Sequence, residues 1–239
     1  MPNNYFQLKQ FTVHQQLAAM KVTTDACLFG AWAADDIEKH SASPSTLLDI
    51  GSGTGLLSLM IAQKTPAFID AIEIDKDAFD QTAANFNASP WPERLHALHG
   101  DIRAASPSSY DVIISNPPFY ENDLASPDQK RTSAHHDSTL LLSELISLSK
   151  QLLSEQGFFY LLIPFKRLEE IKQMTSENGL TISMICNVRQ SVNHSFFRSM
   201  LLIRKTRTVL QTQELAIRQH DNTYTSVFTA LLKDYYLHL

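Results

Sequence analysis

The sequence predicts an α/β fold, in which a mostly parallel β-sheet carries helices on both faces. Short apolar runs of strand length alternate along the chain with segments whose apolar residues have helical spacing, and this alternation is typical of repeated βαβ units. With 239 residues, of which 44% are hydrophobic, the chain is long enough to bury one sizeable core. We therefore expect a single domain, residues 1–239.

The first elements flank a turn rich in glycine. Residues 46–50 form an apolar run that stops at glycines, and residues 56–62 resume apolar positions with helical spread, which predicts a strand, a turn and a helix. Residues 67–73 are expected to form the next strand. Residues 77–86, which open on an acidic cap, are expected to form the helix after it.

The alternation continues toward the C-terminus. We expect strands at residues 95–99 and 110–115, a helix at 139–153 separated by Gly157 from a strand at 158–163, a helix at 168–177, and strands at 180–188 and 196–204. Residues 121–137 are polar and mixed in charge, which predicts a long surface loop that could act as a mobile lid.

Composition argues against several classes of protein. No stretch approaches the roughly 18 uninterrupted apolar residues of a membrane span, and the N-terminus lacks the layout of a secretory signal, so we expect a cytoplasmic protein without membrane contact. Cys27 and Cys186 lack the spacing of zinc ligands or of a disulfide framework, which predicts buried free thiols. His135 and His136 belong to no metal-binding pattern, so no metal is expected.

A glycine turn follows the first predicted strand. Gly51, Gly53 and Gly55 let the backbone turn sharply and approach a ligand, while the helix behind them presents free N–H groups. Glu73 lies 22 residues beyond Gly51, at the end of the next strand, where a carboxylate can accept hydrogen bonds from both ribose hydroxyls. The turn does not follow the G-x-G-x-x-G pattern, so a nucleoside-type cofactor fits better than a pyrophosphate one.

Asp101 follows the third predicted strand. Its position favours a carboxylate that accepts a hydrogen bond from the amino group of an adenine. A turn-capping aspartate is the alternative, because aspartate commonly serves turns.

Residues 116–119, Asn-Pro-Pro-Phe, end the fourth predicted strand, at the edge where open α/β sheets bind ligands. The two prolines stiffen the backbone and remove two N–H donors, which leaves carbonyl acceptors. A planar amino group needs two acceptors, and Asn116 Oδ1 with the Pro117 carbonyl could supply them, while Phe119 could stack on the attached base. The alternative is a loop in which Asn116 caps and the prolines merely end the strand.

Together these motifs resemble those of class I methyltransferases that act on amino nitrogens. The motifs in question are the glycine turn with Asp49, Glu73, Asp101 and residues 116–119. More narrowly, the chain is similar over nearly its whole length to the family of tRNA(Val) adenine-37 N6-methyltransferases. That similarity is carried by residues 11–13, 20–25, 89–94 and 224–236. The run at 89–94, Ser-Pro-Trp-Pro-Glu-Arg, is specific because cofactor chemistry does not demand it.

The resemblance implies a Rossmann-like sheet of seven strands in the order 3-2-1-4-5-7-6, with strand 7 antiparallel. Residues 1–40 would form a segment that covers the cofactor and contacts RNA, and residues 41–239 the catalytic core. The implied reaction is N6-methylation of an adenine in RNA, with adenosine 37 in the anticodon loop of tRNA(Val) as the target. The implied cofactor is S-adenosyl-L-methionine, with Lys21, Thr24, Asp49, Gly51, Gly53, Gly55, Glu73, Asp101 and Asn116 as cofactor-binding residues and Asn116, Pro117 and Phe119 as catalytic residues.

Three positions depart from the pattern of this family. Thr23 stands where glycine is usual, and Phe119 stands where tyrosine is frequent, a change that preserves stacking and loses a hydroxyl. His135 stands where an arginine is usual, which weakens a phosphate contact and makes the choice of RNA less secure than the reaction class.

A net charge of −5 argues against a protein that grips nucleic acid with its whole surface, so any RNA contact must be a local patch. Lys9, Lys21 and Arg198 are the candidate RNA-binding residues, with an ordering role over the cofactor as the alternative for Lys21. Other basic positions considered are Lys130, Arg131, Lys166, Arg167, Arg204, Lys205 and Arg207.

Three other functions share these features. Guanine N2 methylation of ribosomal RNA and methylation of a glutamine amide in a protein use the same acceptor motif. A non-catalytic RNA-binding module with a degenerate fold is the third, and the intact residues 116–118 argue against it, because an inactive site has no need for a rigid pair of acceptors.

Overall fold

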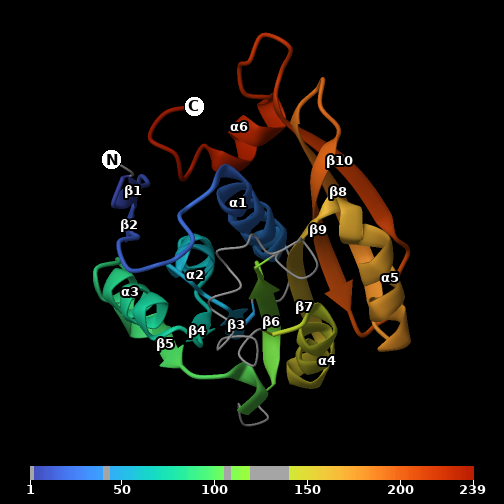
Figure 1. The fold of residues 1–239 in the computed structure, drawn as a ribbon, viewed down its shortest axis with the longest axis horizontal. Coiled ribbons are helices and arrows are strands. Elements are labelled where there is room, and N and C mark those ends of the chain that lie inside the picture. The colour runs from blue at the N-terminus through green and yellow to red at the C-terminus, as the bar shows by residue number, and fades with distance from the viewer. Residues whose placement is uncertain (1–2, 40–43, 105–108, 119–139) are drawn as a thin grey trace, which may run out of the picture.

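The computed structural model describes residues 3–39, 44–104, 109–118 and 140–239. Eight strands of this part form one sheet in the order β10-β8-β9-β7-β6-β3-β4-β5 (Figure 1). The strands are β3 (Thr46–Ile50), β4 (Phe68–Glu73), β5 (Leu95–His99), β6 (Tyr110–Ser115), β7 (Leu153–Pro164), β8 (Thr181–Ser191), β9 (Phe196–Arg204) and β10 (Gln211–Arg218). Phe119, His135, Lys130, Arg131 and the loop expected at 121–137 lie outside the described residues.

The sheet confirms the strand order that the resemblance implies. When β3 to β9 are numbered as strands one to seven, the order reads 3-2-1-4-5-7-6, and β9 runs antiparallel to both β7 and β8. β10 adds an eighth strand at the edge of the sheet, parallel to β8. The apolar periodicity of the sequence does not predict β10, because the first half of this strand is exposed and, within it, only Leu215 and Ile217 are buried.

Gly157 does not separate a helix from a strand as expected. Helix α4 (Leu142–Leu152) passes directly into β7 at Leu153. The pairing of β6 with β7 shifts register between Tyr110 and Val112, and Gly157 lies in this irregular part. An added Cβ there would come 3.0 Å from the Asp111 carbonyl oxygen, so this glycine permits close strand packing instead of marking a boundary.

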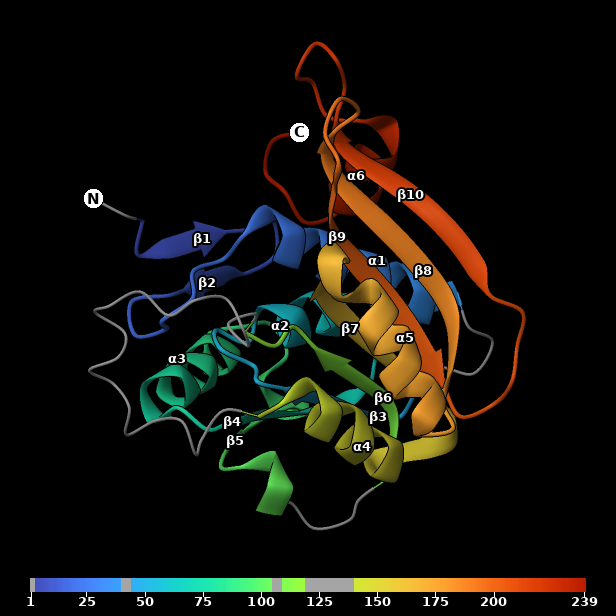
Figure 2. The same ribbon diagram turned by 45° about the vertical axis from the view of Figure 1, so that its right-hand side comes forward.

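Helices cover both faces of the sheet, as Figures 1 and 2 show. One apolar cluster, which includes Phe29, Met60 and Phe228, packs between the sheet and the helices α1, α2 and α6. A second cluster, which includes Leu145 and Ile171, packs under α4 and α5. The bounds of the remaining helices are α1 (Thr24–Lys39), α2 (Leu56–Ala62), α3 (Lys76–Asn87), α5 (Leu168–Glu177) and α6 (Ser226–Leu232).

Both ends of the chain pack on the face covered by α1 and α2 (Figure 1). Strands β1 (Tyr5–Gln7) and β2 (Thr12–His14) form an antiparallel pair, and Phe11 packs edge-on against Trp91, with 5.9 Å between ring centroids. At the other end, the buried Tyr235 hydroxyl donates to the Met60 carbonyl (3.0 Å).

Residues 89–94 have a structural role, because they pack against the N-terminal segment and bond to the connection between α2 and β4. Trp91 provides the ring against which Phe11 packs, and the Arg94 guanidinium donates to the carbonyl oxygens of Thr65 (2.9 Å) and Ala67 (3.0 Å). These carbonyls lie between α2 and β4, so Arg94 satisfies main-chain acceptors where that connection is partly buried.

Two further expectations concern cysteines and membranes. Cys27 and Cys186 are buried and free, as predicted. Within the described ranges, no helix combines the length and apolar character that crossing a membrane requires. The same ranges contain no group of His, Cys, Asp and Glu side chains arranged to hold a metal ion.

Candidate functional site

The glycine turn, Glu73 and Asn116 meet at the carboxyl ends of β3, β4 and β6. Ile50 at the end of β3 pairs with Ile72 on one side and with Ser115 on the other. The residues that follow, the glycine turn, Glu73 and Asn116, therefore leave the sheet at the same level. β3 is the strand from which the order proceeds in both directions, the place where open α/β sheets form their ligand crevice.

The glycine turn faces open space. Gly51 and Gly53 have φ values of 74° and 58°, a left-handed conformation that favours glycine. A Cβ added at either position would meet no atom within 4 Å. At Gly55 a Cβ would meet Phe86 at 2.6 Å. The absence of a side chain at this position therefore lets α3 pack against the turn. The backbone is thus exposed where a cofactor would approach, and packed where the fold requires it.

Glu73 is held rigidly beside this turn. Its Oε2 accepts a hydrogen bond from the Gly53 amide (2.9 Å), its Oε1 accepts one from the Asp75 amide (3.0 Å), and the residue is buried. Because each carboxylate oxygen can accept more than one hydrogen bond, this arrangement leaves acceptor capacity for a ribose diol.

Asp49 lies at the base of the turn and is fully buried. Its Oδ2 accepts a hydrogen bond from Ser58 Oγ (2.7 Å), while Oδ1 has no hydrogen-bond partner among the described residues. Burial raises the pKa of this carboxyl to about 7. An unpartnered buried acceptor next to an open glycine turn fits a ligand that brings a donor or a positive charge.

Asp101 takes the capping role that was the alternative for it. Its Oδ1 accepts from the Arg103 amide (2.9 Å), and the Arg103 guanidinium binds both carboxylate oxygens. Hydrogen bonding by Arg103 lowers the pKa of Asp101. The carboxylate therefore serves a turn in this structure, and a contact to adenine stays a prediction.

Asn116 presents an acceptor that the fold does not use. Its Oδ1 is buried and has no hydrogen-bond partner within the described part of the chain. Pro117 is buried and Pro118 is exposed, while the preceding Ser115 is anchored by donating its hydroxyl to the Ile50 carbonyl (2.8 Å). Leaving a buried acceptor unpaired is costly, and this oxygen is free to accept a hydrogen bond from a ligand.

Lys21 and Thr24 lie where the N-terminal segment enters α1. Lys21 Nζ donates to the carbonyl oxygens of Gln15 and of Ala18, the latter at 3.2 Å. Thr24 is the first residue of α1 and is exposed. The contacts of Lys21 favour its role in ordering this segment over a role in binding phosphate.

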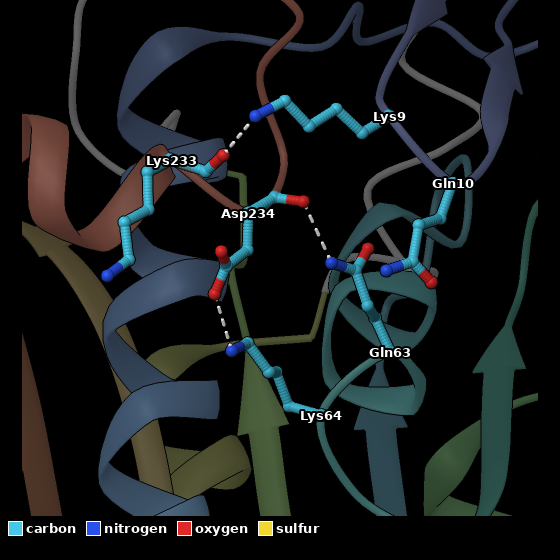
Figure 3. Close-up of a pocket in the computed structure, with 6 residues that line it drawn as sticks. All are labelled: Lys9, Gln10, Gln63, Lys64, Lys233 and Asp234. Carbon is cyan, nitrogen blue, oxygen red and sulfur yellow. Dashed lines mark hydrogen bonds and ion pairs between the residues drawn. The ribbon is translucent and has the colours of Figure 1, made fainter.

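Lys9 lies in a surface cavity of about 330 Å³ between the N-terminal segment, the end of α2 and the end of α6 (Figure 3). Its Nζ donates to the Lys233 carbonyl. Lys64 in the same cavity pairs with Asp234 (2.7 Å) and lies 3.5 Å from Glu38, near the end of α1. The cavity that holds Lys9 therefore lies near the C-terminal end of α1, which is the end away from the glycine turn.

Arg198 lies at the opposite end of α1. Its Nε donates to Asp25 Oδ2 (2.8 Å), and it pairs across the sheet with Pro164 at the carboxyl end of β7. Glu38 lies thirteen positions after Asp25, which corresponds to about 20 Å along the helix axis. Arg198 thus lies at the edge that holds Asn116, whereas Lys9 lies in the cavity whose Lys64 reaches Glu38 near the other end of α1.

Arg204 and Lys205 are also separated from Arg198. Arg204 closes β9 and stacks over Phe158, 4.4 Å from its ring centroid, and Lys205 pairs with Glu155 (3.0 Å). Because β9 runs antiparallel to β7, both lie at the amino ends of the parallel strands. Arg204 and Lys205 therefore do not form one patch with Arg198, since of these three basic residues only Arg198 reaches the site edge.

A buried polar face of α3 completes the site, and its residues are not among those expected from the sequence. Gln81, Thr82 and Asn85 are all buried and bond to the glycine turn or to the N-terminal segment. Their spacing of one turn of helix predicts that they share a face of α3, but nothing in the local sequence distinguishes that face from a solvated one.

The sheet order, the glycine turn at the switch point and the acceptor at Asn116 define a class I S-adenosylmethionine-dependent methyltransferase. Solved structures share this fold. A protein of Agrobacterium tumefaciens described as a predicted O-methyltransferase matches with a TM-score of 0.67 at 16% identity, over 87% of this chain and 95% of that chain. The glycopeptide N-methyltransferase MtfA, solved with S-adenosyl-L-methionine, matches with a TM-score of 0.54 at 10% identity, over 74% and 94%.

Sequence comparison gives the family. The family model described as methyltransferase small domain matches residues 34–176. Two relatives carry the name tRNA1(Val) (adenine(37)-N6)-methyltransferase: one from Christiangramia forsetii, 38% identical over 100% of both chains, and one from Tolumonas auensis, 35% identical over 100% of this chain and 99% of its own. The chain belongs to this family of methyltransferases, and S-adenosyl-L-methionine is its cofactor.

Proposed function

We propose that this protein transfers a methyl group from S-adenosyl-L-methionine to N6 of adenosine 37 in the anticodon loop of tRNA1(Val). The observation that carries the proposal is the buried, unpartnered Oδ1 of Asn116 at the carboxyl end of β6, next to the glycine turn. The full-length relatives named for this reaction support the choice of RNA. An activity on tRNA would operate in the cytoplasm.

The cofactor supplies a methyl group on a sulfonium centre that is already activated. In the proposal, Glu73 accepts hydrogen bonds from its ribose hydroxyls, and the backbone of Gly51 and Gly53 lies against it. The acceptor capacity of Glu73 and the open space before the turn support this assignment. Asp49 Oδ1 adds a buried acceptor on the same side of the sheet. The proposal also keeps four further residues in the cofactor site: Lys21, Thr24, Gly55 and Asp101.

Asn116 acts on the substrate amino group. Its Oδ1 would accept one N6 hydrogen and the Pro117 carbonyl the other, which turns the nitrogen lone pair away from both acceptors. As positive charge develops on nitrogen, these two fixed dipoles stabilise it. Holding the two reactants in line contributes most of the rate enhancement, up to about 7–11 kcal/mol. Phe119 would stack on the adenine.

Adenine reaches this site only if it leaves its stack, which costs less in a single-stranded loop than in a duplex. Arg198, at the carboxyl end of β7, is the proposed phosphate contact nearest to Asn116. Lys9, about a helix length away, could contact a more distant part of a tRNA.

The test is mass spectrometry of nucleosides from tRNA of a strain that lacks the protein, together with methylation of a tRNA1(Val) transcript by the purified chain. Loss of N6-methyladenosine in the strain and activity on the transcript, abolished when adenosine 37 is replaced by guanosine, are expected. Labelling of ribosomal RNA at guanine, or of a protein fraction, would instead support one of the alternative substrates and contradict the proposal.

A further inference from the structure

Helix α3 holds the N-terminal segment through side-chain amides. Asn85 Oδ1 accepts a hydrogen bond from the His14 amide (2.9 Å), and Asn85 Nδ2 donates to the His14 carbonyl (2.8 Å). One turn earlier, Gln81 Oε1 accepts from the Leu17 amide (3.1 Å). Two main-chain positions of the segment are thus fixed to one face of α3.

The same face of α3 holds the glycine turn. Asn85 Nδ2 also donates to the Thr54 carbonyl (2.8 Å), and Thr82 Oγ1 donates to the Gly53 carbonyl (2.9 Å). Asn85 is 1% exposed and Thr82 is fully buried, so water cannot replace these partners. Asn85 is the residue of this set that bonds to both the turn and the segment.

The residues between His14 and the start of α1 are joined to one another by hydrogen bonds. Gln15 is buried, its Oε1 accepts from the Val22 amide (2.8 Å), and its carbonyl accepts from Lys21. A displacement at His14 or Leu17 is therefore transmitted through Gln15 toward the start of α1, where Thr24 lies.

We propose that Asn85 is a positioning residue that couples the N-terminal segment to the glycine turn, so that S-adenosyl-L-methionine bound at the turn also orders the segment. One amide serves the Thr54 and His14 carbonyls with its two donors and the His14 amide with its oxygen. Movement of the turn pulls on the bond to the Thr54 carbonyl and, through the same amide, on the two bonds to His14. The proposal rests on the cofactor assignment above and does not depend on which base is methylated.

Hydrogen exchange of the Leu17 amide measures the coupling directly, because its acceptor is Gln81 and not the residue to be changed. In the wild-type chain, saturating S-adenosyl-L-methionine is expected to slow exchange at Leu17. In Asn85→Ala, calorimetry should give cofactor binding weakened about tenfold, within the range usual for coupling between two sites. Saturating cofactor should then no longer slow exchange at Leu17.

Thr82→Val is the matched control, because it removes a bond to the turn and leaves Asn85 in place. It is expected to weaken cofactor binding while the cofactor still protects Leu17. If Asn85→Ala does not fold, Asn85→Asp keeps an acceptor for the His14 amide and removes the donors to the Thr54 and His14 carbonyls. It should lose the protection in the same way.

Cofactor-dependent protection of Leu17 that persists in a folded Asn85 variant would overturn the proposal, as would its absence in the wild-type chain with cofactor bound. No RNA enters these measurements, so failure of adenine methylation and failure of the coupling are read separately.

Discussion

The Gly53 amide donates to Glu73 Oε2 at 2.9 Å, which joins the glycine turn at the end of β3 to the carboxylate at the end of β4. This bond fixes the proposed ribose acceptor to the same loop that is proposed to contact the cofactor. The glycine conformation and the carboxylate orientation therefore depend on each other.

Glu73→Ala is expected to weaken binding of S-adenosyl-L-methionine by about 1.5–3 kcal/mol, the range for hydrogen bonds to charged groups. Isothermal calorimetry measures this. Glu73→Gln is the matched variant, because it keeps one acceptor oxygen and should lose less. Unchanged affinity in a folded Glu73→Ala chain would remove this residue from the site.

Asn116→Ala should lower kcat by about a hundredfold to a thousandfold, the usual effect of removing a group that stabilises transition-state charge. Cofactor affinity should change little, since the lost contact matters mainly in the transition state. Single-turnover methylation of tRNA and cofactor titration separate the two effects. A variant that keeps more than half of the wild-type turnover would refute the proposed mechanism.

Asp49 predicts a pH dependence of stability. Its pKa is raised to about 7 by burial, above its ordinary 3.8, so the folded chain binds its proton more tightly than the unfolded chain does. The free energy of unfolding contributed by this group therefore falls as pH rises from about 4 to about 7. Urea unfolding of Asp49→Asn, compared with wild type at both ends of this window, should show a smaller loss of stability. An equal loss in both chains would contradict the assignment.

Lys21 and Arg198 should differ in the salt dependence of RNA binding. Lys21 donates to main-chain carbonyls of its own segment, so Lys21→Ala should weaken cofactor binding and leave the salt slope unchanged. Arg198→Ala should flatten the slope of log affinity against log salt by about 0.7, one phosphate contact to a single strand. Binding of an anticodon stem-loop across a salt series measures both slopes. An unaltered slope for Arg198→Ala would confine this arginine to its pair with Asp25.

The sequence predicted the local elements and the reaction class well. The bounds of β3, β5, β6, β9, α2 and α5 agree with the structure to the residue, because each is an apolar segment of one period between turn residues. The glycine turn, Glu73 and Asn116 could be placed together because carboxyl ends of neighbouring parallel strands share one edge. Their individual roles stay predictions.

Tertiary structure alone decided features that join residues far apart in the chain. β10 forms a strand because it pairs with β8, since its own sequence has only a weak apolar pattern. Arg198 reaches the start of α1 through its bond to Asp25, 173 residues away in the chain. Asn85 bonds to His14 and Thr54, and no local pattern announces such a contact. Apolar periodicity acts within one element, whereas a buried hydrogen bond depends on where the folded chain brings its two partners.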